Sequence, residues 1–127
     1  MSAGSVSRHE IILDVKGKSQ LRCELKRHLA PMVVGNIIRA LPIEGNAHIQ
    51  GNGIAYVETR IDSGVERQRK AFRKGDIAFL PSNSSICFVF NDIVSAKPMS
   101  PIGKILSNVE ALGELKPGDV FLITQAT

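Results

Sequence analysis

Aromatic residues are scarce in this chain, which has no tryptophan, one tyrosine and five phenylalanines among 127 residues. Proteins that hold single-stranded nucleic acid without sequence preference usually combine a basic groove with aromatic side chains on which the bases stack. The net charge of +4 provides only a weak, sequence-independent attraction to phosphates. We therefore do not expect nucleic acid to be a partner of this chain.

The chain also has few cysteines and no long hydrophobic run. Its two cysteines, Cys23 and Cys87, each lie within an apolar stretch, which is typical of reduced core thiols in cytoplasmic proteins. A disulfide between them is the alternative. The first apolar run, Ile11–Leu13, is too short for a signal peptide or a membrane span. The sequence thus predicts a cytoplasmic location and no membrane partner.

A chain of 127 residues is long enough for one domain that buries roughly two thirds of the surface of its unfolded form. The start of the chain is polar, so we predict a flexible N-terminal tail over residues 1–9 and a single domain over residues 10–127. No internal repeat or low-complexity segment divides this domain. We expect Leu25, Ile37 and Val120 to lie in its core.

The most informative segment runs from Gln20 to Leu41 and predicts a strand followed by a helix. Apolar and polar residues alternate from Gln20 to Lys26, as in a strand with one buried face. Pro31 stands where a first-turn proline costs no hydrogen bond. Apolar residues then recur at helical spacing, at Val33, Val34, Ile37, Ile38 and Leu41.

Short strands account for most of the remaining pattern. Turn residues separate the predicted strands, which are Glu10–Val15, Ile54–Ile61, Val65–Phe72, Ile77–Leu80, Ile86–Phe90, Ile102–Leu106 and Val120–Thr124. We expect Ile43–Gly53 to be a loop or a broken strand, and Asp92–Pro101 to be a surface loop. Val109–Leu115 predicts a second short helix, capped by Ser107 or Asn108. Mainly β structure with two short helices favours a closed antiparallel barrel of about eight strands, because closure removes unpaired strand edges.

Much of the positive charge lies in one segment, Arg67–Lys74, which surrounds a single aromatic residue, Phe72. Lysines and arginines protect exposed strand edges from pairing with other chains. We therefore interpret this segment as a solvent-facing edge or hairpin. A surface for nucleic acid or for an acidic partner is the alternative.

A series of motifs resembles the cyclophilins, and most closely the small prokaryotic cyclophilin-like proteins, whose function is not settled. The helix led by a proline with Asn36 in its middle is the first of them. Gly75–Leu80, Asn83–Ser85 with Phe88, and Ile102–Lys104 follow in the order found in that family. The resemblance covers most of the chain and implies a shortened cyclophilin-like β-barrel. The chain also resembles this subgroup at Gly45, Ala47, Gly51, Ile54 and Tyr56.

The resemblance implies a weakened activity. A cyclophilin isomerises X-Pro bonds with an arginine that hydrogen-bonds the substrate near the proline nitrogen, a nearby glutamine and an apolar pocket. In the register that the motifs give, Ile49 stands at the arginine position and Ile86 at the glutamine position, while Phe88 matches the pocket phenylalanine and His48 lies beside the family's histidine. Losing one such donor typically costs about 10²- to 10³-fold in rate. Unless Arg60 or another arginine reaches the groove, we expect at most a weak peptidyl-prolyl cis-trans isomerase with no catalytic residue in place.

We therefore predict a binding module with an apolar groove for a peptide or a small-molecule ligand. The groove residues that we expect are His48, Ile49, Ile54, Tyr56, Arg60, Ile86 and Phe88. The three histidines are not at metal-ligand spacing, so we expect neither a metal nor a cofactor. A weak isomerase and a basic module for nucleic acid or an acidic partner are the alternatives, and the sequence indicates no oligomeric state.

Overall fold

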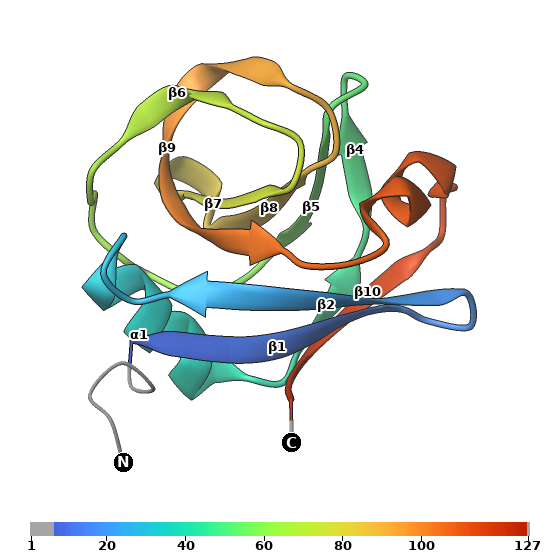
Figure 1. The fold of residues 1–127 in the computed structure, drawn as a ribbon, viewed down its shortest axis with the longest axis horizontal. Coiled ribbons are helices and arrows are strands. Elements are labelled where there is room, and N and C mark those ends of the chain that lie inside the picture. Colours follow the sequence, from blue (N-terminus) through green and yellow to red (C-terminus); the bar gives the residue numbers. More distant parts are fainter. Residues whose placement is uncertain (1–6, 127) are drawn as a thin grey trace.

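The structure is a computed structural model that describes residues 7–126 (Figure 1). The first strand begins at Arg8, two residues before the predicted start, and residues 1–6 of the predicted tail lie outside the described residues. No helix within residues 7–126 is long and apolar enough to cross a membrane. With η for a 3₁₀ helix, the elements are β1 (Arg8–Val15), β2 (Ser19–Lys26), α1 (Pro31–Ala40), β3 (Ile43–Asn46), β4 (His48–Gln50), β5 (Ile54–Glu58), β6 (Arg69–Phe72), β7 (Asp76–Leu80), η2 (Pro81–Asn83), β8 (Ser85–Val89), β9 (Ile93–Ile105), η3 (Val109–Glu114) and β10 (Val120–Gln125).

The strands form one strongly curled antiparallel sheet in the order β3-β10-β1-β2-β9-β7-β8-β5-β4, with β6 paired to β9 (Figure 1). The mainly β class is confirmed, but the predicted closed barrel of about eight strands is wrong. The sheet has ten strands and is open between its end strands, β3 and β4. β3 and β4 follow one another along the chain with only Ala47 between them, which is too short a connection for the two strands to pair with each other. Each therefore pairs with a different neighbour, β3 with β10 and β4 with β5.

The predicted strand and helix between Gln20 and Leu41 are confirmed as β2 and α1. The helix lacks a capping side chain at Ala30, and the cap comes instead from the loop before β6. The Glu66 carboxylate accepts hydrogen bonds from the backbone N–H groups of Met32 at 3.2 Å and Val33 at 2.8 Å. This carboxylate satisfies two of the unpaired N–H groups that begin every α-helix and suits the positive end of the helix dipole.

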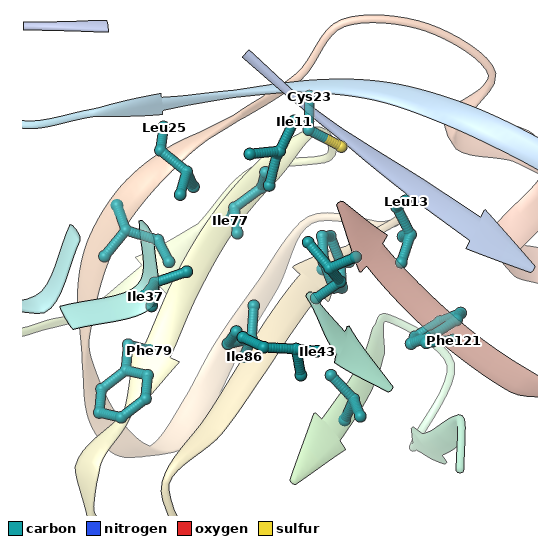
Figure 2. Packing of buried hydrophobic residues seen from close by; sticks show 14 of the residues in the cluster. Ile11, Leu13, Cys23, Leu25, Ile37, Ile43, Ile77, Phe79, Ile86 and Phe121 are labelled. Atoms are coloured by element: carbon teal, nitrogen blue, oxygen red, sulfur yellow. The ribbon is translucent and has the colours of Figure 1, made fainter. Parts of the chain in front are cut away.

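The main core lies on the concave side of the sheet and is covered at one end by α1 (Figure 2). Leu25 and Ile37 are buried there as predicted, but Val120 is only half-buried. Its neighbour Phe121 is fully buried and meets Phe88 edge to face, with ring centroids 5.7 Å apart. Because side chains alternate between the two faces of a strand, the prediction for β10 was off by one residue.

A second, smaller core lies on the outer face of β5, β7 and β8. Its buried members are Ile54, Phe72, Ala78, Cys87, Val89 and Met99. Every residue of β8 is buried, since Ile86 and Phe88 point into the main core while Cys87 and Val89 point into the second one. Strands buried on both faces carry continuous apolar runs, which explains the sequence pattern of β8. Both cysteines are buried and unpaired, so the alternative of a disulfide is excluded.

Two boundaries predicted from the sequence are wrong. The expected surface loop Asp92–Pro101 is mostly strand, because β9 runs through it and pairs with both β6 and β7. Pro98 falls in the stretch where the β6 register shifts, and Pro101 lies beside the register shift in β7; prolines are tolerated at such irregularities. The strand expected over Val65–Phe72 shrinks to its last four residues. The predicted second helix exists as the 3₁₀ helix η3, but no side chain caps it, because Ser107 and Asn108 hydrogen-bond to the backbone of β2 instead.

Candidate functional site

The seven residues predicted for the groove fall on different surfaces. Ile86 and Phe88 are 2% and 0% exposed and face the main core, so a ligand on the outer face of the sheet cannot reach them. Arg60 is exposed beside the chain that leaves α1. Ile49 points to the side of β4 that faces Phe90 and Leu115. The structure therefore does not bring these four residues together with the other three.

His48, Ile54 and Tyr56 do lie together, on the face of the sheet that carries the second core. The antiparallel ladder places His48 opposite Tyr56 and Gln50 opposite Ile54. The His48 and Tyr56 rings stack with centroids 5.1 Å apart and an interplanar angle of 26°. His48 therefore supports the Tyr56 ring from the edge strand.

A cavity of about 360 Å³ opens beside Tyr56, and we call it the Tyr56 cavity. It lies where the segment Ser95–Met99 of β9 crosses the outer face of β5 and β8. Register pairs Tyr56 with Cys87, so the two neighbouring strands present these side chains side by side on the same face. The lining residues are Gln50, Ile54, Tyr56, Leu80, Ser82, Asn83, Cys87, Ser95, Ala96, Lys97 and Met99.

The floor of the Tyr56 cavity is apolar and its rim is polar. Ile54, Cys87 and Met99 form a floor that is at most 6% exposed. Serine and amide side chains line the rim together with Lys97, which is the single charged residue of the lining. Ile54 and Tyr56 were among the residues predicted for the groove, whereas the β9 segment was not, because a surface loop was expected there. The pattern of β8 gave no signal for Cys87, because this strand is apolar throughout its centre and buried on both faces.

The chemistry of this lining favours binding over reaction. Burial raises the pKa of the Cys87 thiol to about 12, so the thiol stays protonated and is a poor nucleophile at neutral pH. No arginine and no carboxylate line the cavity. Within residues 7–126, no three histidine, cysteine, aspartate or glutamate side chains gather closely enough to hold a metal ion.

The basic segment Arg67–Lys74 lies on an edge, as predicted. β6 pairs with β9 alone among the described strands, and Phe72 is the one residue of β6 that is buried. Part of the charge is neutralised locally. The Arg69 guanidinium lies 3.4 Å from an Asp76 oxygen and 4.9 Å from the centre of the Phe72 ring, and Lys74 lies 3.1 Å from Glu110. Weak nucleic-acid binding by this segment stays a prediction.

The model of the cyclophilin-like family aligns with residues 9–124, which is almost the whole chain. The chain belongs to the cyclophilin-like family. The resemblance seen in the sequence is thereby confirmed. No protein of curated function matches this cyclophilin-like chain.

Two solved structures share the cyclophilin-like fold. The hypothetical protein AF2241 from Archaeoglobus fulgidus is similar with a TM-score of 0.81 and 23% identity, over 94% of this chain and 96% of that one. The Mimivirus cyclophilin is similar with a TM-score of 0.59 and 15% identity, over 93% and 86% of the two chains. At these identities the likeness shows the fold alone.

Proposed function

We propose that this cyclophilin-like chain is a binding module whose Tyr56 cavity takes an apolar side chain of a peptide or an apolar small molecule. The observation that carries the proposal is the buried floor of Ile54, Cys87 and Met99 beneath a polar rim whose single charged residue is Lys97. Ligand sites are typically apolar concavities of about 300 to 1,000 Å³ with a few polar groups that fix orientation. The free, buried thiols of Cys23 and Cys87 support a cytoplasmic location as part of this proposal.

Apolar probes should bind in the Tyr56 cavity and should be excluded when its mouth is filled. The probes are the N-acetyl amides of leucine, phenylalanine and proline, observed through the methyl NMR signals of Ile54 and Met99. We expect these signals to shift in the native protein and to stay unchanged in Ala96→Trp, because the indole occupies the mouth beside the exposed Ala96.

Ala71→Trp is the matched control, since Ala71 is also an exposed alanine on a strand but lies outside the Tyr56 cavity. This variant should bind the probes like the native protein. Absence of any shift in the native protein would overturn the proposed function. Equal binding by Ala96→Trp would place the ligand elsewhere.

A standard prolyl-peptide assay should show little or no acceleration over the uncatalysed rate. The lining of the Tyr56 cavity lacks the arginine with which a cyclophilin hydrogen-bonds its substrate near the proline nitrogen, so we expect the barrier of about 18 to 20 kcal/mol to peptide rotation to stay largely unlowered. Ile86→Gln with Ile49→Arg should not restore activity, because Ile86 is buried in the main core and Ile49 faces away from this cavity. Turnover close to that of authentic cyclophilins would refute this prediction.

A further inference from the structure

The edge strand β4 is left without a neighbour on one side. It ends the sheet order and pairs with β5 alone among the described strands (Figure 1). The other end strand, β3, runs close to β5, where an added Cβ on Gly45 would lie 2.8 Å from a methyl of Val57. Unpaired strand edges are ready templates for an extended peptide. The edge of β4, like that of β6, which pairs with β9 alone among the described strands, is therefore open to a further strand.

Cavities lie on both faces of this edge. The Tyr56 cavity, to which Gln50 contributes, lies on one face. On the other face, Ile49, Phe90 and Leu115 line a cavity of about 570 Å³, which we call the Ile49 cavity. Ile49 is 43% exposed, so part of this apolar side chain is open to a partner. Successive side chains of a strand point to opposite faces, so two consecutive residues of an added strand would enter the two cavities.

The linings of the two cavities carry charge of the same sign. Each lining holds one lysine and no carboxylate, with Lys97 at the Tyr56 cavity and Lys116 at the Ile49 cavity. The carboxylate of Asp119 lies close enough to Lys116 to interact with it, but it pairs with Lys18 at 2.9 Å. Both faces of the edge therefore offer an apolar depression beside a positive charge, which is complementary to apolar residues flanked by acidic ones.

We infer that an extended segment of a partner protein adds as a strand to the free edge of β4. The segment carries two consecutive apolar residues, one for each cavity, and an acidic residue on either side of them. The acidic residue before the two apolar residues points to the same face as the second of them. The acidic residue after them points to the same face as the first. Each face therefore receives one carboxylate, which meets the lysine on that face. This inference rests on the proposed function of the Tyr56 cavity and extends it to the Ile49 cavity.

The test uses a labelled peptide, acetyl-Ser-Glu-Leu-Val-Glu-Ser-amide, with binding measured by fluorescence anisotropy and hydrogen exchange measured in the protein. We expect binding that slows exchange of the amides of His48–Gln50. A peptide with N-methylated leucine and valine amides should bind at least about tenfold more weakly, because it cannot donate the strand hydrogen bonds. Replacing both glutamates by lysine should weaken binding to a similar extent.

Lys97→Gln and Lys116→Gln should each weaken peptide binding about two- to fivefold at low salt, with the difference shrinking as salt is added. Lys70→Gln is the matched control, since Lys70 is an exposed lysine outside both cavities and should bind the peptide like the native protein. Equal losses in all three variants would mean that only net charge matters, and would overturn the inference.

The remaining outcomes separate this inference from the proposed function. Equal binding of the N-methylated peptide, with shifts confined to the methyls of Ile54 and Met99, would overturn strand addition and leave the Tyr56 cavity as the site. Failure of both the peptide and the small apolar probes would overturn both proposals. Protection of His48–Gln50 that grows with protein concentration alone, together with a dimer in light scattering, would assign the edge to a second copy of this chain and overturn the inference.

Discussion

Replacing Gly103 by alanine is expected to destabilise the protein by about 3 kcal/mol or more, or to prevent folding. Gly103 lies in β9 directly opposite Leu25 of β2. A Cβ at this position would lie 2.0 Å from the carbonyl oxygen of Glu24 and 3.0 Å from the Cα of Leu25. Both atoms belong to the backbone of the neighbouring strand, so the added methyl group can be accommodated only if β2 and β9 separate. Urea unfolding followed by circular dichroism measures the loss.

Alanine substitutions at two other glycines serve as controls for Gly103→Ala. Gly53→Ala should cost less, because the added Cβ would meet the Cγ2 methyl of Ile93 at 2.2 Å, and a change of side-chain rotamer can move this methyl whereas a backbone strand cannot move so readily. Gly64→Ala should change stability by no more than about 0.5 kcal/mol, since nothing lies within 4 Å of the added atom and the residue is exposed. Equal unfolding midpoints for Gly103→Ala and Gly64→Ala would show that the two strands do not approach as closely as described.

The features that could be predicted from the sequence depend on neighbours along the chain. Alternation from Gln20 to Lys26 and the proline-led spacing after Pro31 correspond directly to β2 and α1. The hairpin between the first two strands follows from Gly17, which adopts a positive φ of 78° in the turn. In each case the local pattern and the final structure agree, as expected where propensity and packing favour the same conformation.

The features that could not be predicted depend on partners far along the chain. β9 has two prolines and little alternation, and its strand character comes from pairing with β6, β7 and β2. Closure of the sheet could not be decided from strand counts, because it depends on which partners β3 and β4 take.

The residues of the candidate site also divide into those that a pattern along the chain indicates and those that depend on distant segments. Ile54 and Tyr56 were found because the resemblance and the alternation agree on the outer face of β5. Ile86 and Phe88 were assigned to the groove from the resemblance alone, and the continuous apolar run of β8 contains no signal that they face inward. Lys97 and Met99 reach the Tyr56 cavity only through the path of β9, which the sequence pattern does not reveal.

Replacing Asp76 by alanine is expected to destabilise the fold by about 2 to 4 kcal/mol. Asp76 is 3% exposed at the start of β7. Its carboxylate accepts hydrogen bonds from the Arg73 backbone N–H at 2.8 Å, from Lys104 Nζ at 2.5 Å and from Arg69 Nη2 at 3.4 Å. Removing the carboxylate leaves the turn N–H without its acceptor and two cations without their common partner. Urea unfolding at neutral pH measures this loss.

The loss of stability expected for Asp76→Ala is smaller than the largest losses caused by breaking a buried ion pair, because the two cations can turn toward water. The side chains of Lys104 and Arg69 are 47% and 51% exposed. Asp76→Asn retains an acceptor for the Arg73 N–H and should lose only about 1 to 2 kcal/mol. Lys104→Met removes one cation but leaves the turn intact, and should cost no more than about 1 kcal/mol. If Asp76→Asn were as stable as the native protein while Asp76→Ala lost the full amount, then charge would not be the reason, since the loss would have to come from the missing acceptor for the Arg73 N–H.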